Sequence, residues 1–220
     1  MVTTDPTDST LILTPTARLA RAERHRRASS AVDSGLSSWR TPRVLAFSNW
    51  MSSLIEEGFV SGAIEQIPVS AVQARALWRS VINHQVFIGE PRVAEMAQAS
   101  WRLIHEFQLP AVGRWSHTGL SVDQQHFCNW AEAYQALCKR RSVSDQWPLA
   151  ARLPDLIRQR RIRVPKRIEL AGFELPMPPL QREILDAASA IGIDVEAPPD
   201  SADQSLLTEI HSFAAVSANE

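Results

Sequence analysis

The stretch Arg167-Ile-Glu-Leu-Ala-Gly-Phe-Glu-Leu-Pro-Met-Pro-Pro-Leu-Gln-Arg-Glu-Ile-Leu185 decides the fold expected for this chain. Its first part, residues 167–173, is typical of a buried strand that ends in a loop. A proline pair follows, and apolar residues at helical spacing predict a helix over 180–190. A strand followed by a covering helix is the repeating unit of α/β folds with a parallel sheet.

Similar strand–helix units lie outward from this stretch. The other expected strands cover residues 9–14, 43–47 and 193–196. Helices are expected over 17–28 and 50–57. Thr16 can cap the first of these helices, and Ser48 or Asn49 can cap the second, because their side-chain oxygens accept from free backbone amides. The strand–helix order therefore predicts an α/β fold with a parallel sheet.

The middle of the chain is helical instead. Apolar residues recur at helical spacing over 70–87, 92–107 and 122–138, and 149–160 is a further expected helix. This pattern predicts a large all-helical insertion over 67–162 between two parts of the α/β core, 1–66 and 163–197. Residues 198–220 are expected to form an acidic linker and a terminal helix over 205–215.

Composition limits the possible classes of protein. The 220 residues carry a net charge of −1, which makes no overall case for nucleic acid or for membrane. No apolar run approaches the ~18 residues of a transmembrane helix, and the N-terminus does not resemble a secretory signal. Cys128 and Cys138 are separated by about 15 Å along one expected helix, too far for a disulfide. A reduced, cytoplasmic protein without membrane association is expected.

The net charge is close to zero, but positive and negative residues are concentrated in different parts of the chain. Residues 17–30 hold five arginines against one glutamate, a local charge of +4. Residues 139–167 carry +8, and residues 169–220 carry −9. Such blocks are either solvated faces or a basic surface that meets phosphates. The sequence leaves both interpretations open.

The residues needed for nucleotide hydrolysis are missing. A phosphate-binding loop needs glycines and a lysine, but Lys139 and Lys166 do not follow glycine, and no glycine follows the strand over 9–14. In nucleotide-driven motor domains, a strand such as 167–173 ends in an acid that holds magnesium, and Ala171 stands at that position. Glu174, three residues further along, is an alternative magnesium ligand, but the sequence has no lysine loop that would hold the phosphates. No ATP hydrolysis and no cofactor are expected.

Other catalytic patterns are not found in the sequence. Its six histidines are scattered, with no His-Glu-x-x-His spacing, and no Gly-x-Ser-x-Gly occurs. His105 is interpreted as a histidine at a core boundary. We therefore expect no catalytic residue and no metal site. Trp50 follows the strand over 43–47 directly, and is either a core residue or a platform on which a base can stack.

Three segments together resemble a known family. They read Leu11-Ile-Leu-Thr-Pro-Thr-Ala-Arg-Leu-Ala-Arg21, Val44-Leu-Ala-Phe-Ser-Asn-Trp-Met51 and Leu170-Ala-Gly-Phe-Glu-Leu-Pro-Met-Pro-Pro-Leu-Gln-Arg182. In this order they look like the N-terminal region of AddB-like proteins, specifically the bacterial "probable DNA repair protein" family. The resemblance implies an inactivated superfamily 1 helicase, with a RecA-like parallel sheet (a degenerate helicase domain 1A). It covers essentially this whole chain but about the first quarter of such a protein. Those proteins end in a PD-(D/E)XK nuclease domain, which nothing here matches.

The resemblance also implies roles for individual residues. Thr14, Thr16 and Arg18 stand where the family's first motif contacts the backbone of single-stranded DNA. Residues 46–50 resemble the Thr-Phe-His-Ser-Phe motif, and Ala171 occupies a degenerate Walker B position. Residues 209–215 resemble the helix that opens the next part of the family's motor. The candidate nucleic-acid-binding residues are Thr14, Thr16, Arg18, Arg21, Ser48, Asn49 and Trp50.

Three functions follow as hypotheses. The first is a non-catalytic scaffold domain of a DNA repair and recombination protein, which binds single-stranded DNA without sequence preference. The second is a protein-interaction module whose helical insertion docks a partner helicase subunit, which would supply the ATPase. The third is an α/β enzyme acting on a small molecule, which requires a polar pocket at the carboxyl ends of the strands.

Overall fold

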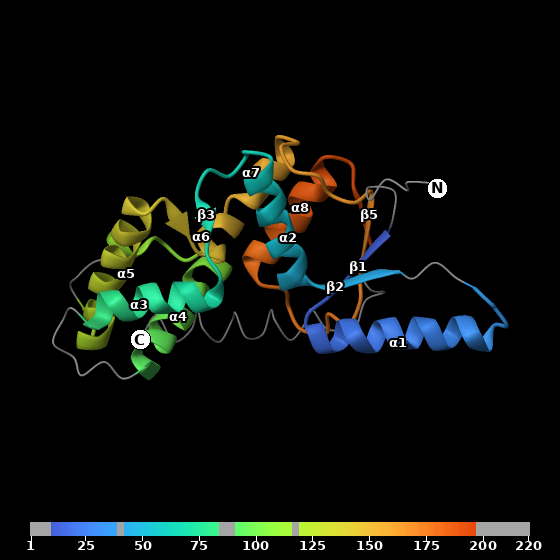
Figure 1. The fold of residues 1–220 in the computed structure, drawn as a ribbon, viewed down its shortest axis with the longest axis horizontal. Helices are drawn as coiled ribbons and strands as arrows, with labels where there is room; N and C mark the ends of the chain where they lie inside the picture. The colour runs from blue at the N-terminus through green and yellow to red at the C-terminus, as the bar shows by residue number, and fades with distance from the viewer. Residues whose placement is uncertain (1–9, 39–41, 84–90, 116–118, 197–220) are drawn as a thin grey trace, which may run out of the picture.

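The computed structural model describes residues 10–38, 42–83, 91–115 and 119–196, and it is a mixed α/β fold. Four strands form one sheet in the order β2-β1-β5-β6 (Figure 1). They are β1 (Thr10–Thr14), β2 (Arg43–Ala46), β5 (Arg167–Leu170) and β6 (Asp194–Glu196). All three strand pairs are parallel, which confirms the predicted α/β class with a parallel sheet.

The two faces of the sheet are covered unequally. Successive side chains of a strand point to opposite faces. Leu11, Leu13 and Ile168 pack in one cluster with α2 (Phe47–Val60), α7 (Leu153–Arg158) and α8 (Pro179–Ala190). Ile12 and Val44 point the other way, where Ala20 of α1 (Ala17–Asp33) covers them. Figure 1 shows α1 apart from the group of α2, α7 and α8.

The helical insertion has a hydrophobic core of its own. It contains α3 (Ala71–Asn83), α4 (Pro91–Glu106), a 3-10 turn (Val112–Arg114) and α5 (Val122–Arg140). Trp78 lies at the centre of this core, stacked on Tyr134 with ring centroids 4.1 Å apart. The two ends of the insertion meet where β3 (Ile67–Pro68) pairs in parallel with β4 (Val143–Ser144).

The segment after β4 belongs to the core of the sheet. The single helix expected over 149–160 is instead two short helices, α6 (Gln146–Ala150) and α7. Pro154 stands in the first turn of α7, where its missing N–H removes no helical hydrogen bond. Leu149, Leu153 and Ile157 are buried against the sheet cluster rather than the insertion cluster.

Several element boundaries differ from the prediction. Helix α2 begins at Phe47, so its N-cap is Ala46, and the predicted caps Ser48 and Asn49 are wrong. The earlier start places Phe47 in the core, where it meets Trp50 edge to face at 5.5 Å. Helix α1 continues to Asp33. Ser9 and the expected helix over 205–215 lie outside the described residues, as do positions 84–87 of the helix expected over 70–87.

Within the described ranges, none of the helices combines the length and the apolar character that crossing a bilayer requires.

Candidate nucleic-acid interface

The carboxyl ends of three strands lie side by side. Thr14 at the end of β1 is the register partner of Ala46 at the end of β2. On the other side, the amide of Ala171 donates to the carbonyl of Leu13 at 2.8 Å. Because α1 and α2 follow β1 and β2 directly, their N-termini open at this same edge. From β1 the chain continues to β2, which pairs on one side of β1, whereas β5 pairs on the other side. In open α/β sheets, such a change in the direction of strand order commonly forms a binding crevice at the carboxyl ends of the strands.

Thr14 is not available to a ligand. Its side chain is 1% exposed, and its hydroxyl donates to the carbonyl of Thr16 at 3.0 Å. The prediction that Thr14 contacts a phosphate is therefore wrong. Thr14 ends a strand that is paired on both sides, so its side chain is enclosed and stabilises the turn into α1.

Thr16 caps α1, as predicted. Its backbone is extended (φ −136°, ψ 155°), and its hydroxyl oxygen accepts from the amide of Leu19 at 3.2 Å. Thr16 is exposed. A hydroxyl that accepts in this way retains its own hydrogen, which can be donated to a phosphate oxygen.

Trp50 is a core residue. It is 1% exposed and packs in the cluster between α2 and the sheet. Of the two interpretations left open for Trp50, the core residue is confirmed. The stacking platform is wrong, because the indole has no free face for a base. Helix α2 starts three residues before Trp50, which turns this side chain toward the sheet.

Ser48 and Asn49 lie exposed in the first turn of α2. Ala46 offers no side-chain cap to this helix. The first amides of a helix have no intrahelical acceptor and carry the positive end of the helix dipole. This turn therefore presents amides and two polar side chains to an anion.

Four of the five arginines of α1 divide into two groups, and the fifth, Arg24, donates to the carbonyl of Ala20 at 3.2 Å. Glu23 accepts from Arg26 and Arg27 at 2.6 Å each, and the hydrogen bond from Arg26 is the main cause that lowers the pKa of Glu23. Arg27 also bonds to Glu169 of β5. These contacts stabilise α1 internally and connect it to β5 of the sheet.

Arg18 and Arg21 form the second group. Both are exposed, and neither makes an ion pair with another described residue. Ala20 is the buried residue of α1, so nearly the whole helix surface faces water. At about 100° per residue, positions 18, 21 and 25 share one side of the helix. That side leads directly from the edge where α1 begins.

Ala171 stands where the resemblance implies the acid of a Walker B strand. Ala171 is half-buried and packs against the cluster of Ile12, Ala20 and Val44. Glu174 is exposed three residues further on. Gly172 between them has a φ of +74°, which favours glycine and reverses the chain after β5. Within the described ranges, no group of three or more histidine, cysteine or acidic residues is placed to hold a metal ion.

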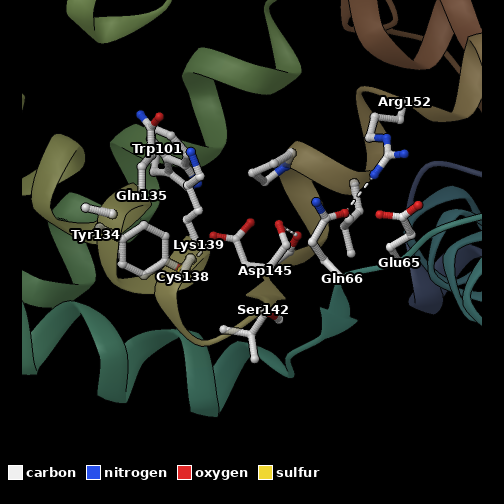
Figure 2. Close-up of a pocket in the computed structure, with 15 residues that line it drawn as sticks. Glu65, Gln66, Trp101, Tyr134, Gln135, Cys138, Lys139, Ser142, Asp145 and Arg152 are labelled. Atoms are coloured by element: carbon white, nitrogen blue, oxygen red, sulfur yellow. Dashed lines mark hydrogen bonds between the residues drawn. The ribbon is translucent and has the colours of Figure 1, made fainter.

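A polar cavity lies elsewhere, at the junction of the insertion and the core (Figure 2). Its volume is about 550 Å³, and its lining comes mainly from α5, β4, α6 and the chain before β3, with Trp101 of α4 and Arg152. Asp145 stands in its middle, with Lys139 on the α5 side and Glu65 and Arg152 opposite. Arg152 donates to Gln66 at 2.7 Å. Because this cavity is not at the carboxyl edge of the four-stranded sheet, it does not meet the requirement of the enzyme hypothesis.

Asp145 in this cavity has a structural role. It is 4% exposed and accepts from the hydroxyl of Tyr134 at 2.7 Å and from the amide of Trp147 at 2.9 Å. Burial raises the pKa of Asp145, while these two hydrogen bonds act in the opposite direction. Burial also raises the pKa of the neighbouring Cys138 thiol, so this cysteine is a poor nucleophile. Asp145 caps α6, and its hydrogen bond with Tyr134 connects α6 to α5. The spacing of apolar residues in the sequence did not predict this contact.

Replacing Tyr134 with phenylalanine is expected to lower the free energy of unfolding by about 1–3 kcal/mol, because a buried carboxylate loses a donor. The folded pKa of Asp145 is already above its unfolded value, so this group lowers stability as pH rises. Without the hydrogen bond from Tyr134, the pKa of Asp145 in the folded state rises further. The difference between the free energies of unfolding of the two proteins should therefore grow as the pH rises above the usual pKa of an aspartate, as measured by denaturant unfolding.

Asp145→Asn provides the control for that measurement. The Asp145→Asn variant has no carboxylate at this position. Adding Tyr134→Phe to it should therefore lower the free energy of unfolding by an amount that does not change with pH. A loss of stability in the native background that is equally independent of pH would contradict a hydrogen bond from Tyr134 to the Asp145 carboxylate.

No protein-family model matches the chain, and no curated protein matches it at a significant level.

Proposed function

We propose that this chain is a non-catalytic scaffold domain that binds single-stranded DNA without sequence preference. The binding surface is the carboxyl edge of the sheet together with the exposed side of α1. The single observation that carries the proposal is the position of Arg18 and Arg21, which are exposed and have no ion-pair partner in the described chain. They lie in the first two turns of α1, which opens at the same edge of the sheet as α2.

Each part of this surface suits a phosphate. Helix N-termini bind anions through free amides and the helix dipole. Ser48, Asn49 and Thr16 add side-chain donors of the kind that contact DNA backbones. Arg18 and Arg21 add charge that attracts any sequence equally. With Trp50 buried, the proposal rests on backbone contacts alone and includes no base stacking.

The proposal also concerns the origin of the domain. The parallel sheet is taken as a degenerate RecA-like helicase domain, in which Ala171 replaces the magnesium ligand and no lysine loop precedes α1. Such a domain guides a strand without hydrolysing ATP. A helicase partner subunit would then supply the motor for DNA repair or recombination in the cytoplasm.

The double substitution Arg18→Glu/Arg21→Glu tests the surface. It should weaken binding of a fluorescent oligo-dT strand about tenfold or more at low salt, a change of about 1.4 kcal/mol, as measured by anisotropy. The matched control is Arg79→Glu/Arg140→Glu, which makes the same charge change at exposed positions of the insertion. Thermal melts should show both variants folded.

Two outcomes oppose the proposal. Equal weakening by both double substitutions would mean that total charge, rather than this surface, attracts DNA. No binding by the native protein at low salt would leave the interaction-module hypothesis, which recovery of a helicase by pull-down would then support.

A further inference from the structure

The polar cavity between the insertion and the core of the sheet lies where two hydrophobic clusters approach each other (Figure 2). Its volume is about 550 Å³. The lining combines Leu149 of the sheet cluster with Trp101 and Tyr134 of the insertion cluster. A small molecule in this cavity would therefore contact both parts of the fold.

The charged side chains of the cavity are separated from one another. Two acids and two bases line it: Glu65, Lys139, Asp145 and Arg152. None of them makes an ion pair with another described residue, and Arg152 donates to the neutral side chain of Gln66 instead. In Figure 2, Asp145 lies between Lys139 on one side and Glu65 on the other. Charges of both signs are therefore available to a ligand.

Asp145 is the buried member of this set. It is 4% exposed, whereas the other three charged side chains are exposed. Each of its oxygens accepts one hydrogen bond, from the hydroxyl of Tyr134 and from the amide of Trp147. Both donors are neutral, and a carboxylate has about four acceptor sites, so the charge and part of the acceptor capacity of Asp145 remain unmatched. A buried charge of this kind costs free energy, which an ammonium group in the cavity would offset.

The two bases at the rim limit the kind of ligand further. Lys139 and Arg152 would repel a ligand that carries only positive charge. Glu65 and Asp145 would repel a ligand that carries only negative charge. The guanidinium of Arg152 has N–H groups beyond the one that bonds to Gln66, and such groups bind carboxylates well. A molecule with both charges therefore finds a partner for each.

We propose that this cavity binds a small zwitterion, a molecule with one ammonium and one carboxylate group. The ammonium donates to the buried carboxylate of Asp145, and the carboxylate accepts from Lys139 and Arg152 at the rim. The volume lies within the roughly 300–1,000 Å³ that is usual for small-molecule sites. The inference is independent of DNA binding, because the cavity shares no residue with α1 or with the carboxyl edge of the sheet.

Matched probes test the ligand class on the full chain. The zwitterions are γ-aminobutyrate and ε-aminocaproate, and the controls are butylamine, hexylamine, butyrate and caproate, which keep one charge each. Amide NMR spectra should show at least one zwitterion binding at concentrations up to about 10 mM, with the changes centred on residues 134–145. The matching amine and acid should bind at least about tenfold more weakly. Equal binding by an amine or an acid, or no binding by either zwitterion, would overturn the proposal.

Substitutions in the lining test the assigned partners. Asp145→Asn removes the charge that takes the ammonium, and Lys139→Gln/Arg152→Gln removes both charges that take the carboxylate. Each variant should bind the zwitterion about tenfold more weakly or worse, while its spectrum shows a folded protein. Arg79→Gln/Arg140→Gln is the control, because it makes the same charge change at exposed positions outside the lining and should bind like the native protein. Native affinity in both lining variants, or equal weakening in the control, would contradict the site.

Discussion

Replacement of Trp50 by alanine is expected to lower the free energy of unfolding by about 3–5 kcal/mol. The indole is almost fully buried between α2 and the sheet, and it meets Phe47 edge to face at 5.5 Å. Removing it leaves a cavity in the cluster that also contains Leu11, Leu13 and Ile184. Denaturant unfolding followed by circular dichroism measures the loss.

Trp50→Phe separates this structural role from a role in binding. The smaller aromatic ring fills part of the space, so the loss of stability should be smaller than for alanine. Affinity for single-stranded DNA should stay at the native value while the protein is folded. A Trp50→Ala protein with native stability but weakened DNA binding would contradict the core assignment and return Trp50 to the binding surface.

The second large effect is expected at Trp78, the centre of the insertion. Its alanine variant should also lose about 3–5 kcal/mol, because the side chain has no exposure and stacks on both Tyr134 and Phe127. The edge-to-face contact with Trp101, at 6.1 Å, would be lost as well. Chemical unfolding monitored by the fluorescence of the remaining tryptophans measures this change.

Val72→Ala is the matched control on the same helix. Val72 is 77% exposed, so its truncation should change stability by less than about 0.5 kcal/mol. If Trp78→Ala were equally mild, the insertion would not have the independent hydrophobic core described above.

Local sequence patterns predicted the sheet well. Short aliphatic runs marked β1 and β2, and the strand–helix order correctly implied parallel pairing. Thr16 was recognisable as a cap because its side chain acts on its own helix. Signals of this kind depend on neighbours in the sequence, which the sequence itself displays.

Contacts between distant segments were not predictable in the same way. The burial of Thr14 depends on strands that pair with β1 from both sides, one of them more than 150 residues away. The start of α2 at Phe47 depends on the core that receives this ring. Asp145 preceding a short helix is a recognisable cap pattern, but its bond to Tyr134 depends on how α5 and β4 come together. Two of the seven candidate binding residues were therefore misplaced by reading the sequence locally.

The salt dependence of single-strand binding tests the central claim most directly. If Arg18 and Arg21 each replace a counterion on a phosphate, the logarithm of the binding constant should fall linearly with the logarithm of salt concentration, with a slope of about −1.4 or steeper. Anisotropy titrations of an oligo-dT strand between about 50 and 200 mM salt give this slope. Binding that does not change with salt, or no binding at the lowest salt, would contradict the account.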